Sequence, residues 1–155
     1  MSTTIKFFAA GIPAPGGSKV GFVNPKTGRV VVKEDCKRNA SWRSIVAHSA
    51  LQAYRGPPLT GPVNMQIHFV MPRPKSHYRS GRYASWRRAE APFFHEKAPD
   101  TTKLIRSTED ALKGIAWKDD SQVAIQTAFK TYGVCPGAHV TITPARVEDL
   151  PFGIV

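Results

Sequence analysis

Apolar residues recur along the chain with two spacings, one typical of strands and one typical of helices. The clearest strand is residues 63–71, where apolar side chains at positions 63, 65, 67 and 69 alternate with polar ones. Such alternation predicts a strand with one buried and one solvated face. Further strands are expected at residues 5–10, 19–23, 29–33, 122–132 and 138–147. The segments 19–23 and 29–33 should pair as a hairpin, because Asn24-Pro-Lys-Thr-Gly28 between them is typical of a turn.

Two segments have helical periodicity. The first is expected from about Cys36 to Tyr54, with Asp35 as its cap, and the second from Thr101 to Ile115. The second carries its apolar residues on one face, which should pack on the sheet. Strands outnumber helices, and there are too few connections for a doubly wound sheet. The order predicts an α+β fold: a single compact domain over residues 1–155, with one mixed β-sheet and both helices against one face.

The amino-acid composition indicates a polyanionic partner. The 155 residues include 22 Lys and Arg against 11 Asp and Glu, a formal net charge of +11. Nucleic acid is the commonest partner of such a surface, although a merely soluble basic protein stays open. Cys36 and Cys135 have no zinc-ligand spacing, so free thiols in a reducing cytoplasm are expected. No apolar run approaches the roughly 18 residues of a membrane span.

Five of the eleven acidic residues lie within residues 97–123. Carboxylates gathered in a basic chain suggest a divalent cation, and Mg²⁺ prefers oxygen ligands, often one or two carboxylates plus phosphate oxygens. Each acid also has a simpler explanation. Asp100 can cap the second helix, Asp110 can pair with Arg106, Glu109 can lie on a solvated face, and Asp119-Asp120-Ser121 can be a polar turn. Bringing Asp119 and Asp120 near Asp100 requires the connection 113–121 to fold back.

Residues 72–99 form a long aperiodic loop in which cations alternate with aromatic side chains. Loops of this length in a compact domain are usually functional or disordered. Cations next to aromatics suit contacts with the DNA backbone and stacking on unpaired bases, whereas the alternative is a solvated insertion. We expect the loop to be mobile without DNA and to order on binding. Its candidate DNA contacts are Arg79, Arg82, Trp86, Arg87, Arg88 and Lys97.

Two motifs together resemble a known family. Residues 99–114 read Pro-Asp-x-x-Lys-Leu-x-Arg-x-x-x-Asp-Ala-Leu-x-Gly, and residues 117–123 read Trp-x-Asp-Asp-x-Gln-Val. This pattern resembles the RusA family of Holliday junction resolvases, and the Gly-Ile-Pro-Ala-Pro-Gly-Gly-Ser-Lys segment at 11–19 is similar to its phage-type members. The resemblance implies a small mixed α/β domain. It also implies a homodimer that cuts branched, four-way DNA with Mg²⁺, or with Mn²⁺ in its place, by one symmetric nick from each subunit.

The same resemblance assigns site residues. Asp100, Asp119 and Asp120 match the family's catalytic, metal-binding carboxylates, and Arg106 matches a basic helix residue that is more often Lys. The second aspartate of the family's Asp-x-Asp motif falls on Thr102, which has no charge and is a poorer ligand.

The departure at Thr102 leaves several roles open. Glu109, further along the helix, is a candidate metal ligand in place of that missing acid, and Thr102 itself could ligate through water. Lys103, Lys113 and Lys19 are candidate contacts to the DNA backbone. The Gly16-Gly17-Ser18-Lys19 segment has only a weak likeness to a phosphate-binding loop. Two alternatives also remain: a non-catalytic DNA-binding protein, and a metal-dependent nuclease without junction preference.

Overall fold

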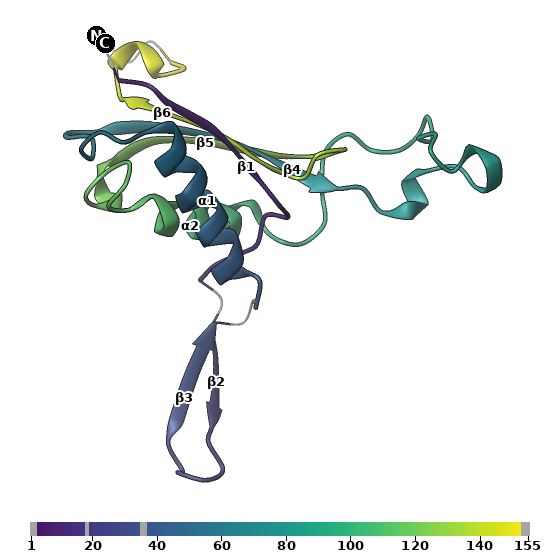
Figure 1. Ribbon diagram of the computed structural model, residues 1–155, viewed down its shortest axis with the longest axis horizontal. Helices are drawn as coiled ribbons and strands as arrows, with labels where there is room; N and C mark the ends of the chain where they lie inside the picture. The colour runs from purple at the N-terminus through teal and green to yellow at the C-terminus, as the bar shows by residue number, and fades with distance from the viewer. Residues whose placement is uncertain (1–2, 18, 35–36, 153–155) are drawn as a thin grey trace.

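A mixed four-stranded sheet forms the body of the protein (Figure 1). We describe a computed structural model, which covers residues 3–17, 19–34 and 37–152. Strands lie in the order β1 (Ile5–Ala10), β6 (Gly137–Pro144), β4 (Val63–Pro72) and β5 (Val123–Gly133). β4 and β5 are parallel, whereas β6 is antiparallel to both β1 and β4. The predicted α+β architecture is confirmed.

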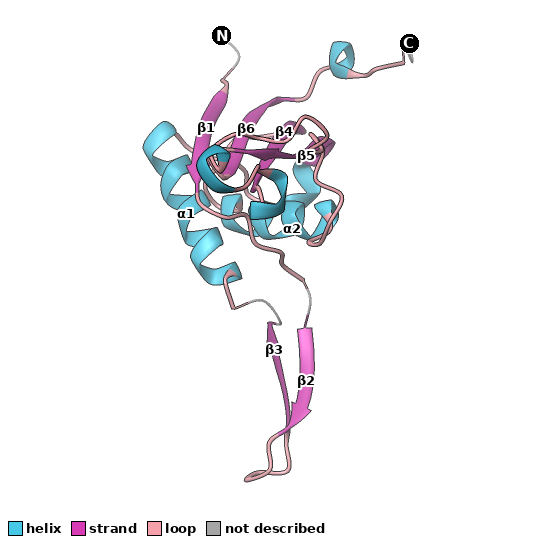
Figure 2. Ribbon diagram, turned by 90° about the vertical axis from the view of Figure 1, so that its right-hand side faces the viewer, coloured by secondary structure: helices cyan, strands magenta, loops and turns pink. Residues whose placement is uncertain are grey.

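Both helices cover the same face of the sheet (Figure 2). α1 is Asn39–Ala53 and α2 is Thr101–Leu112. The buried face predicted for β4 is confirmed, because the side chains of Val63, Met65, Ile67 and Phe69 are at most 1% exposed. The opposite face is only partly solvated, since Asn64 and Val70 are buried as well. Trp42 of α1 and Leu104 of α2 pack into the same core. Burial of these apolar side chains is the main force that holds the helices to the sheet.

The hairpin differs from the expected single sheet. β2 (Lys19–Val23) and β3 (Val30–Glu34) pair with each other in a separate two-stranded sheet, which projects from the body (Figure 1). Its turn is as predicted, and Gly28 adopts φ +66°. Alternating apolar residues identify a strand but not its partner, so the sequence did not separate this pair from the main sheet.

Two helix boundaries also differ from the prediction. The expected cap Asp35 and start Cys36 lie outside the described residues, and α1 begins at Asn39. α2 ends at Leu112 instead of Ile115, because Gly114 takes φ +82° and donates its N–H to the carbonyl of Trp117 at 2.7 Å. That left-handed glycine ends the helix and turns the chain toward β5.

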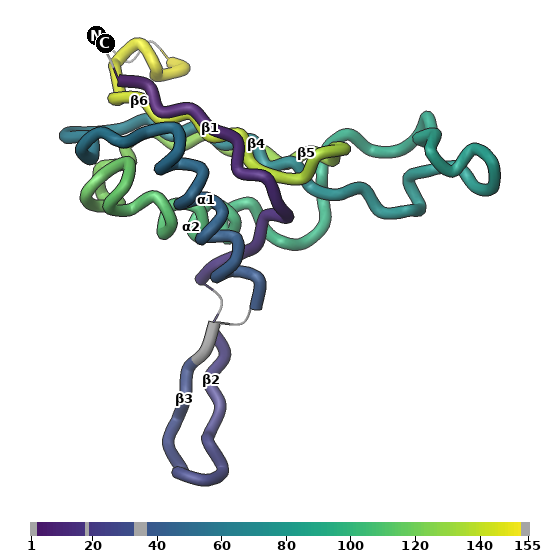
Figure 3. The backbone as a smooth tube through the Cα atoms, viewed as in Figure 1, coloured from purple at the N-terminus to yellow at the C-terminus, as the bar shows by residue number. Residues whose placement is uncertain are grey.

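Residues 73–99 form an arm at one end of the sheet (Figure 3). The arm has more local order than its sequence predicted, with two 3₁₀ turns (Lys75–His77 and Gly81–Tyr83) and a bridge between Tyr78 and Arg87. Its return segment lies along β5 through a bridge between Phe94 and Thr131. In the part of the chain that the structure describes, no helix has both the length and the apolarity of a membrane span.

Candidate functional site

An open cavity of about 660 Å³ runs along α2. It is lined at one end by Asp100 and Thr102, along its length by Arg106 and Glu109, and on the β5 side by Gln126. Thr102, Arg106 and Glu109 share this side because residues four and three apart lie on one helix face. The structure therefore gathers the predicted helix residues around one space.

Asp100 lies at the N-cap position of α2, yet its side chain makes no capping hydrogen bond. Only its backbone carbonyl serves the helix, accepting from the N–H groups of Lys103 and Leu104 at 3.1 Å each. The side chain is 70% exposed, and Lys103 Nζ lies 3.8 Å from its Oδ2. The capping explanation therefore does not account for this carboxylate, which faces solvent beside the cavity.

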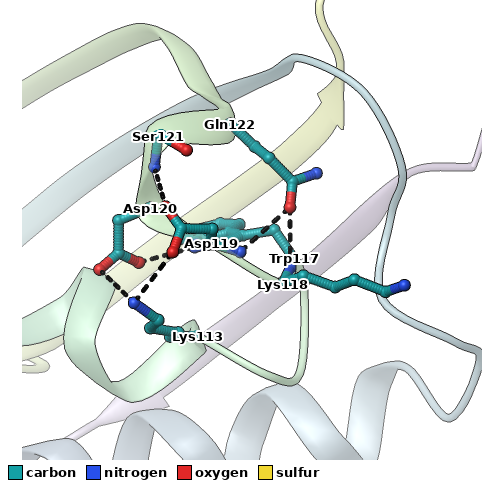
Figure 4. Close-up of polar contacts among 7 residues, drawn as sticks. All are labelled: Lys113, Trp117, Lys118, Asp119, Asp120, Ser121 and Gln122. Carbon is teal, nitrogen blue, oxygen red and sulfur yellow. Dashed lines mark hydrogen bonds and ion pairs between the residues drawn. The ribbon is translucent and has the colours of Figure 1, made fainter.

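The turn 117–122 holds the other two aspartates (Figure 4). Asp119 accepts a 3.0 Å hydrogen bond from the Ser121 N–H and caps a 3₁₀ turn at Asp120–Gln122. Asp120 Oδ1 accepts a 2.9 Å hydrogen bond from Trp117 Nε1, whose ring is fully buried. This buried donor orients the Asp120 carboxylate, whereas the Asp119 carboxylate stabilises the turn.

Lys113 places a positive charge between these two aspartates. Its Nζ lies 3.4 Å from Asp119 Oδ2 and 3.7 Å from Asp120 Oδ2 (Figure 4). Hydrogen bonds from Ser121 and then Lys113 lower the pKa of Asp119 to about 2, and Asp119 and Asp120 in turn raise the pKa of Lys113. Both aspartates therefore lie near the Lys113 ammonium group, although such exposed ion pairs contribute little to stability.

The environment of Glu109 disfavours its ionisation. Burial raises its pKa, and the negative charge of Asp120 raises it further. A 2.6 Å hydrogen bond from Gln126 Nε2 and the charge of Arg106 oppose these effects. Two carboxylates close enough to repel suit a cation held between them.

The predicted carboxylates do not form one cluster. Asp120 lies within electrostatic reach of Glu109, whereas Asp100 lies at the opposite end of α2. Among the described residues, no group of three or more His, Cys, Asp or Glu side chains is gathered for a metal ion. The donors are nevertheless hard oxygen ligands, and one or two carboxylates with substrate phosphates are a common set for Mg²⁺. Their chemistry fits such a cation.

Arg106 lies against the glycine-rich segment. A Cβ atom on Gly17, which has φ +80°, would come within 2.5 Å of Arg106 Cδ, and one on Gly16 would come within 2.9 Å of Ser107 Cβ. The Ser107 hydroxyl donates to the carbonyl of Ala14 at 2.6 Å. These glycines therefore allow a close approach to α2. Lys19 and Arg106 line an adjoining cavity of about 460 Å³ with Arg43, Asp110 and Gly17.

The arm presents cations beside aromatic rings. Arg79 lies over Trp86 at 5.8 Å and Arg82 over Tyr83 at 4.8 Å, measured to the ring centroids. Trp86 is 58% exposed. The remaining predicted DNA contacts on the arm are also at the surface: Arg87 is exposed, Arg88 donates to the Tyr78 carbonyl at 2.9 Å, and Lys97 lies 3.9 Å from Glu96. Whether the arm orders on binding stays a prediction.

Sequence reasoning missed three residues that hold this site together. The Gln122 side chain bonds four backbone groups, Gln126 bonds Glu109, and Lys130 bonds two carbonyls directly before Asp100. Gln122 is part of the Trp-x-Asp-Asp-x-Gln-Val motif, but the sequence assigned it no function. The other two carry no local signal, because their partners are distant in the sequence.

Comparisons with known proteins agree with the motif. A protein-family model described as Endodeoxyribonuclease RusA matches residues 16–143. The chain is also similar to a Bacillus subtilis (strain 168) protein described as uncharacterized protein YqaN, with 30% identity over 139 residues. That alignment covers 89% of this chain and 94% of the relative.

Proposed function

Because the chain belongs to the RusA endodeoxyribonuclease family, we propose that it is a metal-dependent endodeoxyribonuclease that resolves four-way (Holliday) DNA junctions by paired nicks. The observation that carries this proposal is the position of Asp100, whose exposed side chain does not cap α2 and lies at one end of a cavity also lined by Arg106 and Glu109. An exposed carboxylate that does not cap its helix, beside an arginine that can bind phosphate, suits phosphodiester cleavage.

Asp120 and Glu109 are proposed to hold a metal ion together, with Asp119 as a further carboxylate of the same turn as Asp120, and Asp100 is proposed as a separate metal ligand at the other end of α2. Mg²⁺ or Mn²⁺ held by these carboxylates would supply the activation of a water molecule and the stabilisation of the leaving oxygen of the phosphodiester. Trp117 fixes the orientation of Asp120, and Gln126 fixes that of Glu109. Phosphate oxygens would complete the ligand set, because the described carboxylates do not gather into a cluster of three.

Arg106 is proposed to bind the scissile phosphate and stabilise its developing charge. It suits this role because it lines both the cavity of Asp100 and the adjoining cavity of Lys19. Lys19, Lys103 and Lys113 are proposed to neutralise neighbouring phosphates. The arm would contribute stacking through Trp86 and positive charge through Arg79, Arg82, Arg87, Arg88 and Lys97.

Symmetric nicking implies two equivalent active sites, so we propose that the enzyme acts as a homodimer with C2 symmetry. Because the proposed substrate is the DNA of a bacterium or an infecting phage, we propose that the enzyme acts in the cytoplasm. Both proposals follow from the reaction.

A second candidate is a DNA-binding protein with weak or no catalysis. The observation that favours it is Thr102, which lines the cavity next to Asp100 where the resemblance implies an acid. A nuclease without junction preference is a third candidate, separated from the first by its substrates.

The test uses a labelled four-way junction with wild-type protein, Asp120→Asn and the control Glu148→Gln, in Mg²⁺ and in chelator. We expect paired nicks from the wild type and the control in Mg²⁺ alone, and none from Asp120→Asn. Cleavage in chelator, or by Asp120→Asn at the wild-type rate, would refute the metal assignment. Equal cutting of three-way, flap and linear DNA would favour the third candidate, and binding without cutting would favour the second.

A further inference from the structure

Lys130 on β5 reaches the chain that leads into Asp100. Its Nζ donates hydrogen bonds to the carbonyl of Lys97 at 2.9 Å and to the carbonyl of Pro99 at 2.7 Å. Pro99 directly precedes Asp100, and Asp100 is the N-cap residue of α2. The Lys130 ammonium group therefore holds, by hydrogen bonds, two backbone carbonyls that lie within three residues of Asp100, a proposed metal ligand.

The Lys130 side chain is partly buried. Lysine ammonium groups are almost always in water, and burial lowers the pKa of this one, while the charge of Asp100 acts in the opposite direction. An amine that is partly removed from water has to be compensated by partners. The two carbonyls and the Asp100 carboxylate are those partners, and all three belong to residues 97–100.

The same stretch of β5 also holds the end of the arm. The Lys130 carbonyl accepts a 3.2 Å hydrogen bond from His95 N–H, and the Tyr132 N–H donates to the carbonyl of Phe93 at 2.9 Å. Residues 93–95 are thus held by the backbone of β5, and residues 97–99 by the side chain of Lys130. This segment joins the DNA-binding arm to Asp100.

We infer that Lys130 is a positioning residue, whose ammonium fixes the segment 97–99 and so holds the Asp100 carboxylate in place when the arm binds DNA. The inference rests on the proposed function, since it assigns Asp100 a role in cleavage. Displacement of a catalytic group by about 1 Å can lower a rate about 100-fold, so loss of this anchor should act on turnover more than on DNA affinity.

The test compares Lys130→Met, which removes the charge and the donors, with Lys130→Arg, which keeps both. Lys6→Met is the matched control, because Lys6 is an exposed residue of β1 outside the site. For each protein we would measure kcat on a four-way junction in Mg²⁺, junction affinity in chelator, and hydrogen exchange of the amides in residues 96–103. Thermal unfolding checks that each variant is folded.

We expect Lys130→Met to lower kcat by about 10- to 100-fold, with junction affinity in chelator within about threefold of wild type and faster exchange confined to residues 96–103. Lys130→Arg should recover most of the rate and the protection, and Lys6→Met should match the wild type.

Two results would overturn the inference. One is a Lys130→Met protein with wild-type kcat and exchange; the other is general loss of protection and affinity without recovery in Lys130→Arg, which would mean a purely structural role. If the wild type cuts no junction at all, the proposed function fails, and the exchange data still decide whether Lys130 holds the segment.

Discussion

Replacement of Gln122 by methionine should destabilise the turn that carries Asp119 and Asp120. The Gln122 side chain accepts hydrogen bonds from the N–H groups of Lys118 (2.9 Å) and Asp119 (3.1 Å). It also donates to the carbonyls of Leu59 and Gly61, both at 2.9 Å. Methionine keeps the approximate size and removes all four bonds.

The expected decrease in stability is set by these four hydrogen bonds. A hydrogen bond contributes about 0.5–1.5 kcal/mol net. Leu59 is 9% exposed, but the N–H groups of Lys118 and Asp119 belong to exposed residues that water can reach, so the four bonds together should be worth about 2–4 kcal/mol. For a chain of this size, each kcal/mol lowers Tm by roughly 2–4 °C, which predicts a decrease of roughly 5–15 °C.

Thermal unfolding followed by circular dichroism measures this decrease, with Gln52→Met on the exposed face of α1 as the control. Cleavage of a four-way junction, assayed well below both melting temperatures, should also fall, because Asp120 loses its fixed position. A Gln122→Met protein that melts within about 1 °C of wild type would refute the role of this side chain in stabilising the turn. A mutant that melts lower but cuts at the wild-type rate would show that the turn contributes to stability and not to catalysis.

Three further predictions concern the arm and the acids. Arg87→Glu should weaken junction binding and make the negative slope of log affinity against log salt shallower by about 0.9 for each phosphate that the arm no longer neutralises. Equal affinity to wild type at every salt concentration, measured by fluorescence anisotropy, would contradict a role for Arg87. Thr102→Asp should raise the cleavage rate at low Mg²⁺, and an unchanged Mg²⁺ dependence would count against a weakened site. Ionised Asp119 should stabilise the fold above pH 4 or so and lose this effect as the pH falls toward about 2, because its folded-state pKa is lowered from 3.8 to about 2. The difference in Tm between wild type and Asp119→Asn should therefore shrink over that range, and a constant difference would contradict this assignment.

The elements with strong local periodicity were predictable from the sequence. Alternation placed β4 correctly because every odd position from 63 to 71 is buried in the core. The turn with Gly28 and the position of α2 were predictable for the same reason, since turn chemistry and helical spacing act within a few residues. The separation of the hairpin from the main sheet was not, because strand pairing depends on long-range contacts.

The candidate site was predictable in its composition but not in its arrangement. The motif named Asp100, Asp119, Asp120 and Arg106. The structure added that the Asp100 side chain does not cap its helix, that Asp119 caps a turn, and that Asp120 is oriented by a buried tryptophan. The same residue types in the same spacing allow either role for each carboxylate, so only side-chain contacts could distinguish them.

The sequence by itself determined the basic charge, the strand and helix segments, and the chemistry available between residues 97 and 123. Those properties depend on composition and on spacings of a few residues. Only the tertiary structure decided which distant groups meet. The parallel pairing of β4 with β5 and the packing of α2 beside them bring Lys130 to the carbonyls before Asp100, and Gln126 to Glu109. These contacts join residues 17 to 33 positions apart, and no local pattern encodes such contacts, because they exist only when the core is packed.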